Sequence, residues 1–127
     1  MNKTTNTTFD ELLFCAKQEE WGFVDTHIGE HVGLKETMWA VDQGLHDPDQ
    51  NVRDLAATIL DESEGHFGPA IMETLEAQMR ADTHHIVRLR LAVALWKHGR
   101  QTDEVRSMMD AALADPDVGS TAHKWLN

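Results

Sequence analysis

The 127-residue sequence contains a single cysteine, Cys15, and no apolar run long enough to cross a membrane. A membrane-spanning helix needs roughly 20 mostly apolar residues. One cysteine excludes an internal disulfide and a zinc site made from several thiolates of one chain. The opening MNKTTNTTF also lacks the apolar segment of a signal peptide. We therefore predict a flexible polar end over residues 1–8, no membrane association and a cytoplasmic location.

Basic residues are also scarce. Against 22 Asp and Glu the chain has 11 Lys and Arg, a formal net charge of -11. Such a field repels nucleic-acid phosphates and attracts basic proteins. We expect a basic protein as the partner and no binding to nucleic acid. The alternative, that the charge serves only solubility, stays open.

Sequence motifs for nucleophilic catalysis and phosphate binding are missing. Ser63, Ser107 and Ser120 do not lie in nucleophile-elbow sequences, and the chain has no glycine-rich phosphate loop. Cys15 falls on the apolar face of its predicted helix, where a thiol behaves as a small hydrophobe. We therefore predict no catalytic residue and no enzymatic activity.

One short stretch has the composition of a metal site. The heptapeptide DTHIGEH places His27, Glu30 and His31 in the order H-x-x-E-H, which is the pattern of inverted zinc peptidases. Two imidazoles four residues apart on a helix can hold zinc, with the glutamate as general base. A peptidase, however, carries this motif on a long helix, and here Gly29 interrupts it and Gly33 follows it. We predict no metal and no cofactor.

The same heptapeptide has a simpler interpretation. Asp25 and Thr26 are residue types that cap helices with their side-chain oxygens. We expect them to cap a short helix or turn that joins the N-terminal helix to the rest of the chain.

The sequence repeats itself with a period of about 34 residues, which is typical of helical arrays. Residues 36–60 align with residues 70–95, and a third copy begins at residue 103. Apolar residues at three- and four-residue spacing predict the first helix of each copy over residues 34–45, 71–79 and 105–113.

Asp-Pro pairs separate the helices of a copy. Proline cannot continue a helix but fits the first turn of the next one. We therefore predict that Pro48 and Pro116 start second helices and that Asp47 and Asp115 are their N-caps. The stretch FDELLFCAKQEEWGF, residues 9–23, predicts an amphipathic helix, capped by Thr8 or Asp10, that closes the N-terminal end of the array.

The pattern D-P-D-x-x-V-R-x-x-A-A at Asp47 to Ala57 is similar to the turn and second helix of HEAT repeats, especially the short repeats of phycobilisome-lyase-like proteins. The resemblance covers about Gly33 to the C-terminus. It implies an all-α fold: a short α-solenoid of about three HEAT-like helical hairpins with an N-terminal capping helix, in one domain over residues 9–127. It also implies that Arg53 and Arg88 reach toward acidic turns and that the protein holds other macromolecules.

Two functions of different classes are compatible with this sequence. The first is a non-catalytic protein–protein interaction module with an acidic surface, as in the small HEAT-like bacterial proteins that serve as immunity or inhibitor proteins. The second is a lyase-type or other small enzyme or accessory protein on a HEAT-like scaffold. We favour the first because the chain is acidic and lacks catalytic motifs.

A comparison of two repeats indicates where a partner would dock. The polar residues Asp54, Thr58 and Asp61 of the first copy correspond to Leu89, Val93 and Trp96 of the second. The latter three are spaced i, i+4 and i+7, so they form one stripe opposite the core face of their helix. We predict that partner-binding residues lie at these six positions, with Trp96 as the anchor, and a homodimer is a second option. The alternative is that the stripe is buried within the chain.

Overall fold

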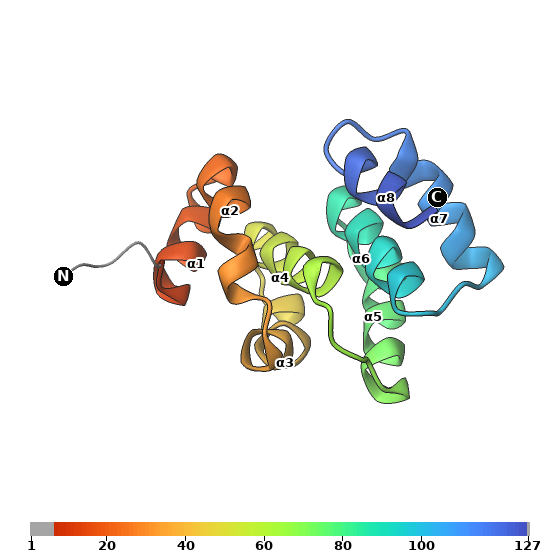
Figure 1. Cartoon of the computed structure of the whole chain (residues 1–127), viewed down its shortest axis with the longest axis horizontal. Coiled ribbons are helices and arrows are strands. Elements are labelled where there is room, and N and C mark those ends of the chain that lie inside the picture. Colours follow the sequence, from red (N-terminus) through yellow and green to blue (C-terminus); the bar gives the residue numbers. More distant parts are fainter. Residues whose placement is uncertain (1–6, 127) are drawn as a thin grey trace. The chain divides into compact units, whose positions relative to one another are not determined.

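The computed structural model describes residues 7–126, with side chains described over residues 7–124, and this part of the chain contains helices and no strand. The predicted all-α class is confirmed (Figure 1). The longer helices are α1 (Phe9–Lys17), α2 (Trp21–His27), α3 (Leu34–Asp42), α4 (Gln50–Glu62), α5 (Pro69–Ala81), α6 (His85–Lys97), α7 (Asp103–Leu113) and α8 (Gly119–Leu126). Two short 3-10 helices are η1 (Ile28–His31) and η2 (Gly44–His46). Over the described residues, none of these helices has both the length and the apolar character needed to cross a membrane.

The chain divides into two compact units, residues 1–63 and residues 64–127. Each is described separately below as the N-terminal and the C-terminal unit. The prediction of a single domain over residues 9–127 stays a prediction, because the cooperativity of unfolding decides it.

The predicted flexible segment, residues 1–8, lies mainly outside the described residues. Its last two residues are described, and both of their N–H groups donate to side-chain carboxylates. Thr7 N donates to Glu30 Oε1 at 2.9 Å, and Thr8 N donates to Glu11 Oε1 at 2.9 Å. These two residues are therefore part of the ordered N-terminal unit.

α1 begins with a capping box. Thr8 Oγ1 accepts a hydrogen bond from Glu11 N at 3.1 Å, while the Glu11 carboxylate accepts one from Thr8 N. This reciprocal pair satisfies two N–H groups that the start of a helix leaves without partners. The helix packs against α2 and α4 and buries Leu12 and Ala16. The predicted amphipathic helix is therefore confirmed for residues 9–17, with Thr8 as its cap.

The predicted continuation of α1 to Phe23 is wrong, because the chain turns sharply after Lys17. Glu19 adopts a left-handed conformation, with φ of 61°. Its N–H donates to Ala16 O at 3.0 Å, and Glu20 N donates to Cys15 O at 2.9 Å. This pair of bonds is the Schellman motif that ends many helices, although glycine usually occupies the left-handed position. α2 then starts at Trp21 as a separate helix.

The first hairpin consists of α3, η2 and α4, which pack on one another. The predicted helix over residues 34–45 ends at Asp42, and η2 continues it as a tighter turn. Gly44 allows this turn to lie close to α4. A Cβ atom at Gly44 would lie 2.7 Å from Ala56 Cβ and 2.8 Å from the Trp39 ring.

The turn before α4 uses two aspartates in succession. Asp47 Oδ1 accepts a hydrogen bond from Asp49 N at 2.8 Å, and Asp49 Oδ1 accepts one from Asn51 N at 2.8 Å. The N-cap of α4 is therefore Asp49, not the predicted Asp47, and Pro48 precedes the helix instead of opening it. The physical reason is that Asp47 stabilises the turn itself, which delays the start of the helix by two residues.

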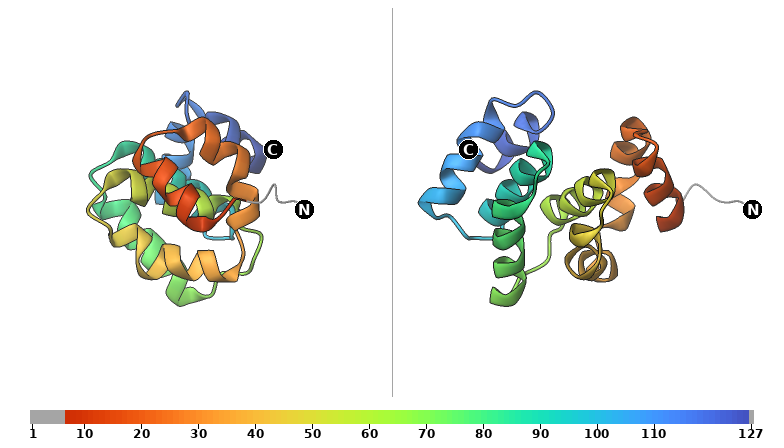
Figure 2. Two further views of the ribbon diagram at one scale, coloured as in Figure 1. Left: turned by 90° about the vertical axis from the view of Figure 1, so that its left-hand side faces the viewer. Right: turned by 180° about the vertical axis from the view of Figure 1, so that it is seen from behind.

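The C-terminal unit contains two more hairpins, α5 with α6 and α7 with α8 (Figure 2). α6 packs against α5 on one side and against α7 and α8 on others. This position explains why α6 is apolar around most of its circumference, and its buried side chains are Val87, Leu89, Leu91, Ala92, Val93, Ala94 and Leu95.

The turns of these two hairpins repeat the geometry of the first. Asp82 Oδ1 accepts a hydrogen bond from His84 N at 2.8 Å, and Asp115 Oδ1 accepts one from Asp117 N at 2.8 Å. α8 begins only at Gly119, so the predicted N-cap role of Asp115 is wrong for the same reason as that of Asp47. An aspartate that bonds the N–H two residues ahead is thus common to all three hairpin turns.

Two arginines at equivalent repeat positions also bind backbone carbonyls. Arg53 Nη1 on α4 donates to Asp47 O at 2.9 Å and to Pro48 O at 3.1 Å. Arg88 Nε on α6 donates to Met79 O at 2.9 Å, near the end of α5. Each arginine therefore ties the second helix of its hairpin to the end of the first helix or to the turn.

Candidate functional site

The H-x-x-E-H residues do not converge on one point. His27 ends α2, whereas Glu30 and His31 lie in η1. His27 Nδ1 lies 3.1 Å from Glu30 Oε2, while His31 Nδ1 lies 3.8 Å from Glu36 Oε2. The two imidazoles thus pair with different carboxylates. Within the part of the chain that the structure describes, no three His, Cys, Asp or Glu side chains are arranged to hold a metal ion.

Glu30 instead connects two segments of the N-terminal unit. Its carboxylate accepts hydrogen bonds from the Thr7 N–H and from His27. Both bonds lower the pKa of Glu30, and the bond from Thr7 has the larger effect. The predicted capping role of Asp25 and Thr26 is wrong, because both lie inside α2. Thr26 Oγ1 donates to Gly22 O at 2.9 Å, one helical turn earlier.

The six predicted partner-binding residues differ in accessibility. Five of them are buried: Asp54, Thr58, Asp61, Leu89 and Val93. Trp96 is half-buried, and Arg106 Cζ lies 5.5 Å from the centroid of its ring. A partner could reach the five only if the groups that cover them moved, so Trp96 is the member of this set with accessible surface. The docking role of these residues stays a prediction.

The negative charge is concentrated in the N-terminal unit, a distribution that the composition of the whole chain does not predict. Residues 1–63 contain 13 Asp and Glu against four Lys and Arg, and residues 64–127 contain nine against seven. The N-terminal unit therefore carries -9 of the formal net charge of -11. A basic partner would be attracted mainly to this unit.

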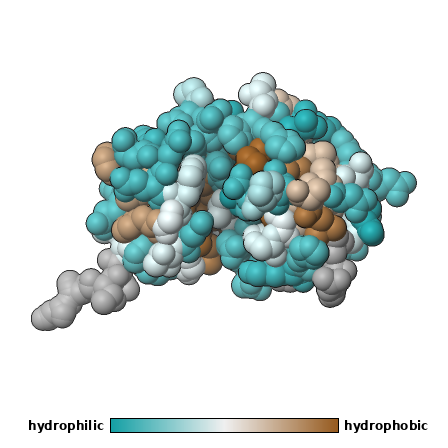
Figure 3. Space-filling view, turned by 90° about the horizontal axis from the view of Figure 1, so that it is seen from above, coloured by the Kyte–Doolittle hydropathy of each residue, from teal (hydrophilic) through white to brown (hydrophobic). Residues whose placement is uncertain are grey.

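The N-terminal unit also exposes large apolar side chains. Among the described side chains the exposed large hydrophobics are Phe14 (60% exposed), Leu34 (79%) and Met38 (39%). Leu34 and Met38 lie one turn apart on α3, and Phe14 lies on α1. Hydrophilic residues dominate the face shown in Figure 3, with smaller apolar areas between them. Apolar side chains bordered by charge are a common feature of protein-binding surfaces.

A pocket of about 400 Å³ lies between α1 and α2. We call it the α1–α2 pocket. Two aromatic rings and a thiol provide its apolar surface, and three carboxylates accompany them; the lining residues are Asp10, Glu11, Phe14, Cys15, Glu20 and Phe23. Phe14 lies outside the apolar face that α1 buries. A phenylalanine at such a position of an amphipathic helix is the sequence signal that could have identified this pocket.

The ionisation of the pocket follows from its hydrogen bonds. Hydrogen bonds from Thr8 lower the pKa of Glu11, and the bond from its backbone N–H has a larger effect than the bond from its hydroxyl. The Glu11 carboxylate therefore stays charged at neutral pH. Burial raises the pKa of the Cys15 thiol, and a hydrogen bond to Glu20 together with the charges of Glu20 and Glu11 raises it further. Cys15 is therefore a neutral thiol, which is a poor nucleophile and a poor metal ligand.

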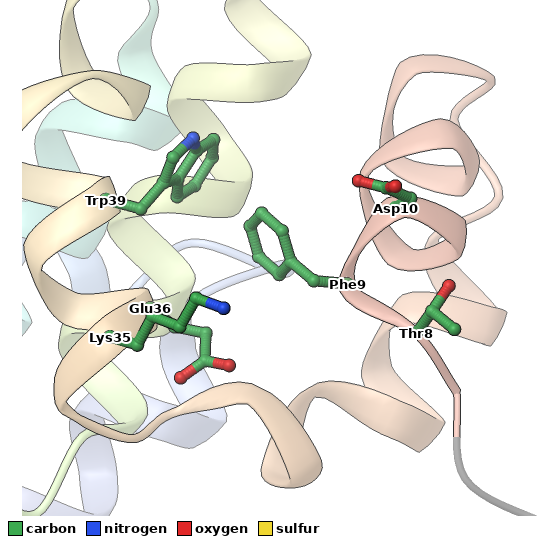
Figure 4. A pocket seen from close by; sticks show the side chains of 6 residues that line it. All are labelled: Thr8, Phe9, Asp10, Lys35, Glu36 and Trp39. Carbon is green, nitrogen blue, oxygen red and sulfur yellow. The ribbon is translucent and has the colours of Figure 1, made fainter.

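A second pocket of about 390 Å³ lies between α1 and α3. Figure 4 shows Phe9 projecting from α1 toward Trp39 on α3. Their ring centroids are 4.8 Å apart with the planes at 73°, an edge-to-face contact. Lys35 and Glu36 supply opposite charges to this pocket, whose remaining lining residues are Thr8 and Asp10. Asp10 lines both pockets, so the two are neighbours around the start of α1.

Comparisons with protein-family models, with curated proteins and with solved structures find no match for this chain. The features of this chain that bear on its function are therefore the charges, the exposed apolar side chains and the pockets of the N-terminal unit.

Proposed function

We propose that this protein is a non-catalytic interaction module whose acidic N-terminal unit binds a basic protein. One observation carries the proposal: the unit with a formal charge of -9 is also the unit that exposes Phe14, Leu34 and Met38. Charge of one sign speeds the encounter with a partner of the opposite sign, and apolar side chains supply contact area once the partner has docked.

We further propose that the scaffold is a short α-solenoid of HEAT-like hairpins. Three features support this proposal. The chain has three consecutive helical hairpins after residue 33, and their turns share the same aspartate geometry. Arg53 and Arg88, at equivalent repeat positions, both donate to backbone carbonyls of the turn or of the first helix. HEAT-like scaffolds serve mainly to hold other macromolecules, which agrees with the proposed role.

More specifically, we propose that it is an immunity or inhibitor protein that acts in the cytoplasm by covering a basic effector. A small acidic protein suits this role because electrostatic attraction lets an inhibitor reach its target before the target acts. The neutral Cys15 thiol and the use of Glu30 in a structural hydrogen-bond pair support a role without catalysis.

The test is affinity capture with the full chain as bait, from the cells that naturally make it. We expect one stoichiometric protein with a net positive charge. Its association rate should fall steeply as salt is raised from about 0.01 M to about 0.15 M, since the screening length shrinks from about 30 Å to about 8 Å. Duplex DNA, offered as a control, should not bind. An acidic stoichiometric partner, or an association rate that salt does not change, would contradict the proposal.

A further inference from the structure

The α1–α2 pocket combines features that suit one kind of side chain. Phe14 is 60% exposed at the pocket, and Phe23 on α2 supplies a second ring. Asp10, Glu11 and Glu20 are lining residues of the same pocket. A ligand that fits must therefore offer apolar surface to the rings and positive charge to the carboxylates.

Arginine meets both requirements better than other side chains. Its aliphatic stem packs against apolar surface while the charged head stays near water or carboxylates. Its guanidinium is planar, stacks on aromatic faces and can bond a carboxylate through two N–H groups. A lysine ammonium is a compact, strongly hydrated charge, and it lacks the flat face that the Phe14 and Phe23 rings favour.

The neighbouring pocket and other ligand classes fit less well. The α1–α3 pocket contains Lys35, whose ammonium would repel a cation. An anion in the α1–α2 pocket would meet three carboxylates, and an uncharged apolar ligand would remove water from those carboxylates without replacing it. Burial contributes most to the raised pKa of the Cys15 thiol, and Glu20 and Glu11 raise it further.

We infer that the α1–α2 pocket is the anchor site for the basic partner and that it takes an arginine side chain from that partner. The inference rests on the proposed function and specifies where the partner binds and through which chemistry. It differs from the predicted docking stripe at Trp96, because the pocket lies in the N-terminal helical pair outside the repeats.

The experiment is a titration of the ¹⁵N-labelled full chain with N-acetylarginine methylamide, followed by amide NMR shifts. The matched control ligand is N-acetylcitrulline methylamide, which has nearly the same shape but no charge. We expect saturable shifts centred on Phe14, Cys15, Glu20 and Phe23 with the arginine compound, and much smaller shifts with the citrulline compound. Shifts spread evenly over the acidic residues, or centred on Trp39, would overturn the inference.

Two pairs of variants make the test specific. Phe14→Ser removes an exposed ring from the pocket, and Leu34→Ser removes an apolar side chain that is still more exposed but lies outside the pocket. Glu20→Gln removes a pocket charge while keeping an acceptor for the Cys15 thiol, and Glu73→Gln removes an exposed charge on α5. We expect the Kd of N-acetylarginine methylamide to rise about threefold or more in Phe14→Ser and Glu20→Gln. Its Kd should not change in the two controls, whose positions lie outside the pocket. Equal effects within a pair would overturn the inference.

The same variants separate this inference from the proposed function. If a basic protein is captured with steep salt dependence and Phe14→Ser leaves its affinity unchanged, the pocket assignment fails and the proposed function stands. If the captured partner is acidic, the proposed function fails whatever the arginine titration shows.

Discussion

At the scale of single residues, the left-handed conformation of Glu19 is the clearest local strain. The Schellman turn that ends α6 has the same hydrogen bonds, with Arg100 N donating to Leu95 O at 2.8 Å, but its left-handed residue is Gly99, with φ of 103°. A residue with a Cβ costs roughly 1 kcal/mol more than glycine in this conformation. Glu19 Oε2 accepts an exposed and long hydrogen bond from Asn51 Nδ2, at 3.4 Å, which offsets little of this cost.

We therefore expect opposite effects from two substitutions at equivalent positions. Glu19→Gly should raise the free energy of unfolding by about 1 kcal/mol, and Gly99→Ala should lower it by about the same amount. Urea unfolding monitored by circular dichroism measures both. A loss of stability in Glu19→Gly would show that the glutamate side chain contributes more than its backbone conformation costs.

The capping box of α1 predicts a specific sensitivity to acid. The pKa of Glu11 in the folded chain lies below its ordinary value of 4.5 because Thr8 donates hydrogen bonds to the charged carboxylate. The unfolded chain therefore takes up this proton first as the pH falls. The stabilising contribution of Glu11 is complete above pH 4.5 and is lost as the pH falls through its lowered pKa.

Glu11→Gln should consequently lose less stability than the parent between about pH 5 and pH 3. The same change at the exposed Glu73 is the control for the loss of one carboxylate, and the difference between the two variants isolates the effect of the capping box. Identical pH profiles for Glu11→Gln and the parent would mean that the capping box does not persist in solution.

Residue patterns predicted which side chains could cap helices but not which of two candidates does so. For α1 the sequence left Thr8 and Asp10 as candidates, and Thr8 is the cap. In the sequence Asp47-Pro48-Asp49, however, both aspartates are capable N-caps, and the choice depends on how many residues the turn consumes. That number is set by the packing of the two helices that the turn joins, which local sequence does not contain.

At the scale of helices, Gly44 controls how closely η2 approaches α4. An added methyl group would overlap Ala56 and the Trp39 ring. We expect Gly44→Ala to destabilise the chain by about 1–3 kcal/mol, the usual range for overpacking. Gly22 lies in α2 with no neighbouring atom within 4 Å of an added Cβ. Gly22→Ala should therefore be neutral or stabilise by up to about 1 kcal/mol. Thermal unfolding of Gly44→Ala and Gly22→Ala would show whether Gly44 is needed for packing or only for its turn.

The last two helices should be needed for the stability of α6. α7 and α8 both pack against α6, and α7 buries Val105, Met109 and Ala112. Deleting residues 101–127 would expose to water the face of α6 that packs against α7 and α8. In repeat arrays each unit depends on its neighbour for burial. We expect the truncated chain to unfold at a clearly lower temperature and over a broader range. A sharp transition at the parent temperature would contradict the repeat arrangement.

The hairpins were predictable because apolar periodicity and helix breakers are local features. The division of residues 9–23 into α1 and α2 was not, because it depends on Glu19 in a conformation that sequence patterns assign to glycine. The apolar character of Leu89 and Val93 on α6 predicted that a second surface would cover them, and both are buried. Sequence alone left open whether the cover comes from the same chain or from a partner.

At the scale of the whole molecule, composition predicted an acidic protein but not the location of the charge. The formal charge of -9 on residues 1–63 and of -2 on residues 64–127 becomes meaningful only once the boundary between the units is known. The exposed apolar side chains and both pockets described above belong to the more acidic unit. We therefore propose that the N-terminal unit attracts the partner.

Two charge-reduced variants test this assignment with equal changes in net charge. One carries Asp25→Asn, Asp42→Asn and Glu62→Gln in the N-terminal unit, and the other carries Glu73→Gln, Asp103→Asn and Asp117→Asn in the C-terminal unit. All six positions lie outside the two pockets, so the variants alter the field without altering the proposed contacts.

The decisive measurement is the association rate of the captured partner with the parent and with these two variants, at low and at physiological salt. Our account predicts a rate that falls steeply with salt in the parent, because attraction between exposed charges is screened. It also predicts a larger loss of rate at low salt for the variant of the N-terminal unit than for the variant of the C-terminal unit. A rate that salt does not change, or a larger loss in the C-terminal variant, would contradict the claim that the acidic N-terminal unit binds a basic protein.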